Sequence, residues 1–260
     1  MHQPRNRQGH VWLLAGTGEG PALAAALQAK GFQVSVSVVT EAAALPYRSL
    51  SLHRVWVGAL SDEQAIVDRL RQEGVDQLVD ATHPFATQIT AQLVMASRQV
   101  GCPLMRYERP IQPASSSRVI ESVESIPAEA LAGQRLLLAL GSRYLGGLVP
   151  PLRAAGALLY ARVLPTPLAL RQAVAAGLPD HHLALLRPLQ GESPGSLEQA
   201  LCRHWGITAV LCRQSGGAAE RCWHEVCVDR GLPLWLLRRP APPSSLLLVH
   251  SVEQMLARLD

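Results

Sequence analysis

The sequence predicts an α/β fold in which two Rossmann-like, doubly wound domains with mainly parallel sheets face a central cleft. Short apolar runs alternate with longer stretches of helical spacing, as expected for parallel strands joined by crossover helices. A glycine follows each of the clearest helical stretches, where it can cap the helix in the left-handed conformation. The same rhythm continues on both sides of a polar, proline-containing segment at residues 110–117.

The apolar runs, rich in Leu and β-branched residues, are the expected strands. In chain order they are Val11–Ala15, Gln33–Val39, Arg54–Val57, Gln77–Asp80, Leu104–Tyr107, Arg135–Leu140, Leu158–Arg162, Leu183–Leu186, Ala209–Arg213 and Leu234–Leu237. The stretches that are apolar at three- and four-residue spacing are the expected helices. They are Pro21–Lys30, Asp62–Glu73, Ala86–Val100, Leu197–Trp205 and Ala218–Arg230, with a closing helix at Val249–Leu259.

The polar segment PIQPASSS, residues 110–117, is the expected domain boundary. We therefore expect a cofactor-binding domain over residues 1–112 and a second domain over residues 113–260 that completes the substrate cleft. A chain of 260 residues is long enough for two such domains.

Composition excludes several classes of protein. With 48% hydrophobic and 17% charged residues, the chain is neither disordered nor collagen-like. The net charge is +4, but the arginines are dispersed, which favours an anionic small molecule over nucleic acid. No stretch is long and apolar enough for a membrane span, and the run before Gly16 is too short for a signal peptide. Five cysteines without a C-x-x-C pair indicate neither a disulfide framework nor zinc, and fit the reducing cytoplasm.

The first expected strand leads into Gly16-Thr17-Gly18-Glu19-Gly20 and then a helix. Small residues at this corner let a pyrophosphate approach backbone N–H groups at the helix N-terminus. The spacing is G-x-G-x-G, whereas common dinucleotide sites have G-x-G-x-x-G, so a simple tight turn is the alternative.

The end of the second strand is where the adenosine ribose is usually recognised. Glu41 is suited to a ribose 2′-hydroxyl, whereas Ser37, Thr40 and Arg48 are suited to a 2′-phosphate. NADH and NADPH both remain open as the cofactor.

The segment Asp80-Ala81-Thr82-His83-Pro84-Phe85-Ala86 joins a strand to a long helix. Polar groups at this carboxyl edge face a ligand crevice, so Thr82 and His83 are candidate site residues. A histidine there can donate to an anion or move a proton near neutral pH. The alternative is that Asp80 or Thr82 caps the helix and His83 is an ordinary loop residue.

Arginines follow strands in both halves, in Arg106-Tyr107-Glu108-Arg109-Pro110 and in Gly141-Ser142-Arg143. Guanidinium groups at strand ends can hold carboxylates in bidentate contacts. Alternatively they form ordinary ion pairs, with Arg106 bound to Glu108 or Glu19.

A second glycine corner, Arg213-Gln214-Ser215-Gly216-Gly217-Ala218, again joins a strand to a helix. Its backbone donors could form a second cradle opposite the first, or the segment could be a flexible turn. No metal site is expected, because His224, Cys222 and Cys227 do not share a helical face.

Taken together, GTGEG, DATHPFA, RYERP, GSRYL and SGG, in this order over residues 11–240, resemble the precorrin-6A reductase family of corrin biosynthesis. The resemblance implies two Rossmann-like domains around a cleft. It also implies that NADPH or NADH reduces an anionic tetrapyrrole, precorrin-6A or its cobalt form, to the corresponding precorrin-6B. No oligomeric state follows from it.

The resemblance also implies roles for individual residues. It assigns Gly16, Thr17, Gly18 and Glu19 to the cofactor loop, Thr82, His83 and Pro84 to the cleft, and Ser215, Gly216 and Gly217 to an opposing clamp. Thr40 contributes at the ribose. His83, or a ring nitrogen's own proton, balances charge as hydride arrives, while Arg109, Arg143 and Arg213 hold carboxylates. The family usually has lysine where this chain has Arg213.

Two other functions would use the same first glycine corner. A nucleotide-sugar or short-chain reductase normally carries Tyr-x-x-x-Lys, which this sequence lacks. A dinucleotide-sensing regulator would need a separate interaction segment, for which we see no room in the chain.

Overall fold

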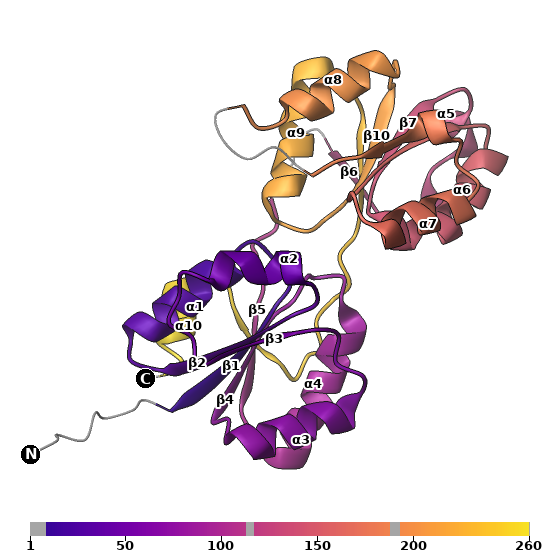
Figure 1. The fold of residues 1–260 in the computed structure, drawn as a ribbon. Coiled ribbons are helices and arrows are strands. Elements are labelled where there is room, and N and C mark those ends of the chain that lie inside the picture. Colours follow the sequence, from indigo (N-terminus) through magenta and orange to yellow (C-terminus); the bar gives the residue numbers. More distant parts are fainter. Residues whose placement is uncertain (1–8, 113–116, 188–192, 260) are drawn as a thin grey trace, which may run out of the picture. The chain divides into compact units, whose positions relative to one another are not determined.

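The computed structural model describes residues 9–112, 117–187 and 193–259 (Figure 1). Within these residues the strands form two six-stranded sheets, and every neighbouring pair of strands is parallel. Helices cover both faces of each sheet. The prediction of two Rossmann-like α/β domains is therefore confirmed.

Contacts divide the chain into two units. The first contains the residues up to Pro110 and those from Pro240 onward, and the second is Ile111–Arg239. We expected residues 240–260 in the second domain, and this assignment is wrong. Residues Leu247–Val249 form a strand that pairs with Met105–Tyr107 of the first sheet, and Met255 is buried in the core of the first unit. Residues 240–259 therefore belong to the first unit.

The first unit has the strand order of a doubly wound fold. Its strands are β1 (His10–Ala15), β2 (Gln33–Val38), β3 (Arg54–Val57), β4 (Gln77–Ala81), β5 (Leu104–Tyr107) and β12 (Leu247–Val249). They lie in the order β3-β2-β1-β4-β5-β12, which reverses between β1 and β4.

Two helical layers cover this sheet. The helices are α1 (Gly20–Ala29), α2 (Glu41–Ala44), the 3₁₀ turn Leu45–Tyr47, α3 (Glu63–Glu73), α4 (Thr87–Val100) and α10 (Val252–Leu256). One core contains Leu23 and Leu27 of α1 with Met255 of α10, and the opposite core contains Leu70 of α3 and Leu93 of α4. Trp12 lies in this second core with its ring edge-on to Trp56.

The second unit repeats the arrangement with one strand displaced. Its strands are β6 (Ser117–Ile120), β7 (Arg135–Ala139), β8 (Leu158–Val163), β9 (Leu183–Leu185), β10 (Ala209–Arg213) and β11 (Leu234–Leu237), in the order β6-β11-β10-β7-β8-β9. Its first strand, β6, lies at the edge of the second sheet, next to β11. In the first sheet the equivalent edge position, next to β5, is occupied by the last strand, β12.

The helices of the second unit include three, α5, α6 and α7, that the sequence patterns did not predict. The helices are α5 (Ala128–Leu131), α6 (Leu145–Ala154), α7 (Pro167–Ala175), α8 (Ser196–His204) and α9 (Ala218–Arg230), with 3₁₀ turns at Val123–Ser125, Ser142–Tyr144 and Asp180–His182. The expectation at Val249–Leu259 is also partly wrong, because its first residue ends β12 and the helix begins only at Val252.

Candidate active site

The strand order of the first unit reverses between β1 and β4. β2 and β3 lie on the β1 side, whereas β5 and β12 lie on the β4 side. In open parallel sheets, ligands bind beyond the carboxyl ends of the strands at such a point. Residues 16–19 follow β1 and residues 82–86 follow β4, so two of the predicted loops meet at this edge.

The loop after β1 packs directly against the loop after β4. The Gly16 N–H donates to the Ala81 carbonyl oxygen at 3.2 Å, and the Thr17 hydroxyl donates to the same oxygen at 3.4 Å. A Cβ at Gly16 would lie 3.1 Å from the backbone nitrogen of His83. Glycine is therefore needed at position 16, because a side chain would push the two loops apart.

Gly18 lies in a different environment from Gly16. A Cβ at this position would have no atom of the described residues within 4 Å, and its φ is not positive. Neither packing in the described chain nor backbone conformation requires glycine there. The space beside Gly18, just before α1, is open.

The N-terminus of α1 has no side-chain cap within the described chain. Its N-cap residue, Glu19, makes no capping hydrogen bond, and the first turn contains Pro21 but no acidic residue. Backbone N–H groups at a helix N-terminus carry partial positive charge and favour anions. This end of α1 is therefore suited to phosphate oxygens.

The Glu19 carboxylate is bound by Arg109, which follows β5. Nε and Nη2 of Arg109 both lie 2.9 Å from Oε2 of Glu19. The pair is partly buried, with 11% of the Arg109 side chain and 31% of the Glu19 side chain exposed. Arg109 thus neutralises the carboxylate beside the α1 N-terminus and ties the segment after β5 to the glycine loop.

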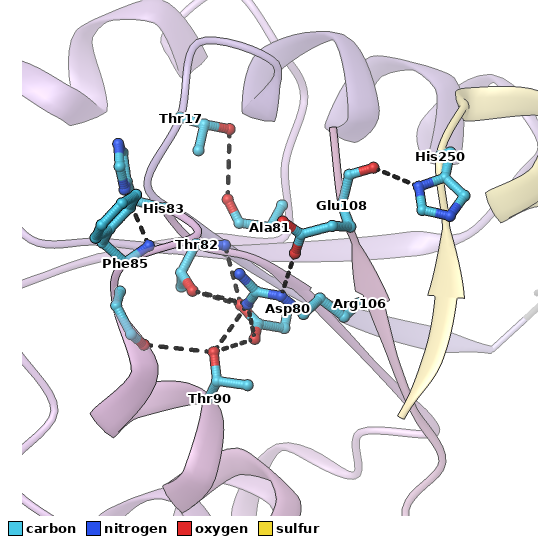
Figure 2. A network of polar contacts seen from close by, with 11 residues as sticks. Thr17, Asp80, Ala81, Thr82, His83, Phe85, Thr90, Arg106, Glu108 and His250 are labelled. Atoms are coloured by element: carbon cyan, nitrogen blue, oxygen red, sulfur yellow. Dashed lines mark hydrogen bonds and ion pairs between the residues drawn. The ribbon is translucent and has the colours of Figure 1, made fainter. Parts of the chain in front are cut away.

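A buried polar network lies beneath the loop after β4 (Figure 2). The Arg106 guanidinium donates through Nη1 to Asp80 Oδ2 at 2.5 Å and to the Thr90 hydroxyl at 2.8 Å, and through Nε to Glu108 Oε2 at 2.7 Å. Both the N–H and the hydroxyl of Thr82 donate to Asp80 Oδ1, at 3.0 Å and 2.6 Å. The network therefore joins β4, α4 and β5.

The charges of this network are almost fully buried. Only 3% of the Arg106 side chain, none of Asp80 and 8% of Glu108 are exposed. Burial by itself would lower the pKa of Arg106, but the two neighbouring carboxylates outweigh burial and raise it. Removing the Arg106 guanidinium would leave two buried carboxylates without the cation between them, at a cost of about 3–5 kcal/mol.

His83 is held by its own loop. The Phe85 N–H donates to His83 Nδ1 at 3.2 Å, and the Ala86 N–H donates to the His83 carbonyl oxygen at 2.7 Å. Because Nδ1 accepts this bond, a neutral His83 ring carries its hydrogen on Nε2. The half-buried ring can therefore act as a hydrogen-bond donor at the carboxyl edge of the sheet.

Of the residues predicted to bind the ribose at the end of β2, only some are exposed to solvent. Thr40 is exposed and caps α2 by accepting from the Ala43 N–H, and Glu41 and Arg48 are also exposed. Ser37 is buried, and its hydroxyl accepts from Trp12 Nε1 at 2.9 Å. The alternative that assigned Ser37 to a 2′-phosphate is wrong, because this side chain lies inside the sheet.

In the second unit the strand order reverses between β7 and β10. Arg213 ends β10, and its guanidinium carbon lies 5.3 Å from the centroid of the Tyr144 ring. Burial lowers the pKa of Arg213, and Tyr144 partly offsets this effect. Ser142 donates to Gln172 Oε1 at 2.7 Å, while Arg143 is exposed.

The predicted second cradle is partly closed by the protein itself. The Gly216 N–H donates to Glu220 Oε2 at 2.5 Å, and Glu220 is fully buried in the first turn of α9. Gly216 therefore has no N–H left for an incoming anion. Ser215 is buried and Gly217 is the N-cap residue of α9.

Sequence reasoning missed three contributors to these sites: Glu220, Thr90 and His250. Glu220 stands three residues after the N-cap Gly217, which is capping-box spacing and could have identified it. Thr90 lies one turn into α4, and His250 follows a strand that was not predicted. His250 Nδ1 lies 2.7 Å from the Glu108 carbonyl oxygen, as Figure 2 shows.

Residues 9–112, 117–187 and 193–259 contain no group of three or more His, Cys, Asp or Glu side chains placed to hold a metal ion. None of the helices in this described part is both long enough and apolar enough to cross a membrane. All five cysteines are free thiols.

Comparisons with known proteins agree on one family. The family model described as Precorrin-6x reductase CbiJ/CobK matches residues 10–260. A cobalt-precorrin-6A reductase of Synechocystis sp. is 34% identical over 236 residues, covering 88% of each chain. A precorrin-6A reductase of Mycobacterium tuberculosis is 28% identical over 247 residues, covering 94% of each.

The solved structures give the same result. The structure of a CobK precorrin-6A reductase matches with a TM-score of 0.74 and 27% sequence identity, and covers 96% of both chains. The family model spans both six-stranded sheets and all the loops described above. The chain therefore belongs to the Precorrin-6x reductase CbiJ/CobK family.

Proposed function

We propose that this protein reduces precorrin-6A, or its cobalt form, to the corresponding precorrin-6B with hydride from NADPH or NADH, in cobalamin biosynthesis. The observation that carries this proposal is the carboxyl edge of the first unit. There an uncapped helix N-terminus and the open space beside Gly18 lie next to the loop that bears His83. The names of the relatives supply the substrate.

The residues at this edge fit a dinucleotide. Gly16, Thr17, Gly18 and Glu19 would hold the pyrophosphate, because the space beside Gly18 is open and no side chain of the described residues caps the N-terminus of α1. Thr40 lies where the ribose is read, at the carboxyl end of the strand next to β1. When bound, the reduced nicotinamide supplies hydride.

His83 and Thr82 would lie beside the reacting atoms. Reduction of a C=N or C=C bond adds a hydride and a proton, so charge must be balanced at the acceptor. With its hydrogen on Nε2, neutral His83 donates a hydrogen bond to the acceptor, while the proton comes from a ring nitrogen of the macrocycle or from water. Protonating His83 at Nδ1 would break its bond from the Phe85 N–H, so we expect the neutral ring to be the active form.

Arginines are suited to the carboxylates of the macrocycle. We assign Arg143, which is exposed, and Arg213, which stacks against Tyr144, to the substrate. Ser215 and Gly217 remain candidates for binding the substrate. Arg109 is bound to Glu19, so we assign it to the cofactor loop.

The test is anaerobic turnover of purified protein with precorrin-6A and with cobalt-precorrin-6A, adding NADH and NADPH separately. We expect oxidation of one cofactor coupled to a change in the visible spectrum of the macrocycle. If the protein binds NADPH or NADH but neither spectrum changes, the proposal fails. A different reductase or a dinucleotide sensor would then be the better assignment.

The His83 role is tested with His83→Gln and His83→Ala. The glutamine side chain keeps an N–H donor, whereas alanine does not. We therefore expect the kcat of His83→Gln to be about ten times higher than the kcat of His83→Ala, with both below the wild type. Equal losses for both variants would argue against a donor role.

The compartment is also part of the proposal. Five free thiols are compatible with reducing conditions. We therefore assign the reaction to the cytoplasm, where thiol labelling of the protein in intact cells should find all five cysteines reduced.

A further inference from the structure

We propose that Arg106 is a positioning residue that acts through His83, holding the loop of residues 82–86 in the arrangement that presents the His83 ring, with its hydrogen on Nε2, at the carboxyl edge of the first sheet. This inference rests on the proposed function, because it concerns how His83 is presented. The side chain of Arg106 is 3% exposed, so it acts from beneath the site, without touching a ligand.

Both ends of the loop are attached to the Arg106 network. At its start, Thr82 is held by two hydrogen bonds to Asp80 Oδ1, and its hydroxyl lies 3.4 Å from Arg106 Nη1. At its end, the Ala86 carbonyl oxygen accepts from the Thr90 N–H at 3.4 Å, while the Thr90 hydroxyl donates its one hydrogen to Asp80 Oδ2 at 2.7 Å. Asp80 and Thr90 are in turn joined to Arg106 (Figure 2).

His83 lies in the loop between the contacts at Thr82 and those at Ala86. Its ring nitrogen and its carbonyl oxygen are both held by N–H groups within the loop, from Phe85 and Ala86. The orientation of the ring therefore depends on the shape of the loop. The shape of the loop depends on the contacts at Thr82 and Ala86, which lead to Arg106.

The same guanidinium fixes the segment after β5. Arg106 holds the Glu108 carboxylate, and the Glu108 backbone accepts from His250 Nδ1 and donates to the Val249 carbonyl oxygen at 2.9 Å. Arg109, the next residue, reaches Glu19 in the glycine loop. Arg106 thus joins the loop after β4 to the C-terminal segment through Glu108, and Arg109 makes the link to the loop after β1.

Only a guanidinium fills this place. Nε faces Glu108 while Nη1 reaches Asp80 and Thr90, which requires a planar fork of donors. A lysine would keep the charge but could not reach all three partners in this geometry. Thr90→Val has nearly the shape of the native residue and removes only the hydroxyl that accepts from Arg106 and donates to Asp80.

The first test is a double-mutant cycle in the full-length protein. We expect Arg106→Lys and Thr90→Val each to lower kcat by about 10- to 100-fold with little change in KM for the cofactor. If Arg106 acts through His83, adding His83→Ala to either variant should cost much less than it costs in the wild type. If the double variant instead loses kcat by the product of the two single-variant losses, the residues act independently and the proposal is overturned.

A matched control is available in the second unit. Glu198→Gln disturbs another buried ion pair, in which Arg162 Nη2 lies 3.5 Å from Glu198 Oε1. Glu198 is 3% exposed at its side chain, so general destabilisation should be comparable. We expect the effects of Glu198→Gln and His83→Ala to multiply. If Glu198→Gln instead reduces the effect of His83→Ala on kcat as much as Arg106→Lys does, the coupling reflects stability alone and the proposal fails.

A second readout needs no turnover. ¹⁵N NMR of histidine side chains, with His83 assigned from the signal lost in His83→Asn, should show the Nε2–H form in the wild type. In folded Thr90→Val and Arg106→Lys we expect the His83 signals to move toward a mixture of tautomers. Unchanged His83 signals in both variants would overturn the inference, whereas an inactive wild type with the expected NMR shifts would count only against the proposed reaction.

Discussion

The loop before α9 in the second unit is closed by a carboxylate of its own helix, whereas the loop before α1 in the first unit is not. Glu220 accepts the Gly216 N–H at 2.5 Å, while Glu19 is turned toward Arg109 and leaves the α1 N-terminus without a side-chain cap in the described chain. Two glycine corners that look alike in sequence therefore differ in whether they can receive an anion. The fold is shared, but the chemistry at the strand ends is not.

The two units also differ in the origin of their sixth strand. β12 lies beside β5 in the first sheet, and β6 lies beside β11 in the second. Along the chain, β6 comes directly after β5 of the first unit, and β12 comes directly after β11 of the second unit. A division of the chain at residue 112 would therefore remove β12 and the buried Met255 from the first unit.

Among the substitutions that compare the two units, the largest effect on stability is expected at Gly20, which begins α1. A Cβ there would overlap the hydroxyl of the buried Tyr47, so Gly20→Ala should lower the free energy of unfolding by about 1–3 kcal/mol. Tyr47→Phe in the same chain removes the overlapping oxygen and should restore part of the loss. Urea unfolding followed by circular dichroism measures both.

The control for Gly20 comes from the corresponding helix of the second unit. Gly147 lies in α6, where a Cβ would meet nothing within 4 Å in the described chain. Gly147→Ala should leave stability unchanged or raise it by up to about 1 kcal/mol. Equal losses at both positions would show that the packing at Gly20 is not special.

The next effect is on binding and separates two glycines of the same loop. Gly18→Ala should weaken NADPH or NADH binding by about tenfold, or about 1.4 kcal/mol, because the methyl group would occupy the space proposed for phosphate. Its unfolding midpoint should match the wild type, since the chain itself leaves that space open. Fluorescence titration of the reduced cofactor tests this, and unchanged affinity would place the pyrophosphate elsewhere.

Particular residues show why much of the fold, but less of the site, could be predicted from sequence. Apolar runs such as Arg135–Leu140 are strands because both faces of a parallel sheet are buried. α6 escaped prediction because Pro150 and Pro151 stand inside it. β6 and β12 are short edge strands next to polar or proline-rich segments, where local pattern carries little information.

For the site, the sequence placed Gly16, Thr82 and His83 at one edge, because strand ends of a parallel sheet meet there. It could not choose between Glu108 and Glu19 as the partner of Arg106. The structure pairs Arg106 with Glu108 and Asp80, and Arg109 with Glu19. Such choices depend on side-chain reach between segments about 90 residues apart, which no local pattern encodes.

A smaller effect is expected from Glu220, which closes the second cradle. Glu220→Gln keeps an acceptor near the Gly216 N–H but loses the charge, so unfolding free energy should fall by about 1 kcal/mol. If the pyrophosphate binds at the first corner, as we propose, cofactor affinity should not change. A clear gain or loss of NADPH affinity in Glu220→Gln would contradict the difference between the two corners.

The smallest effect is a pH dependence carried by the second unit. His182 is buried, its Nδ1 lies 3.0 Å from the Leu159 carbonyl oxygen, and burial is the main cause that lowers its pKa. Below the ordinary value of about 6.5, the unfolded chain takes up a proton that the folded protein still excludes. Stability should therefore fall as the pH drops below about 6.5, and level off once the pH is below the folded pKa.

The His182 contribution can be isolated with His182→Gln, whose amide N–H can still donate to the Leu159 carbonyl oxygen. The variant should lose less than about 1 kcal/mol of stability at pH 7.5 and show a shallower decline toward pH 5.5 than the wild type. Urea unfolding at both pH values gives the difference. If the decline is the same in both proteins, the acid sensitivity lies in other groups, and the buried His182 does not distinguish the second unit from the first.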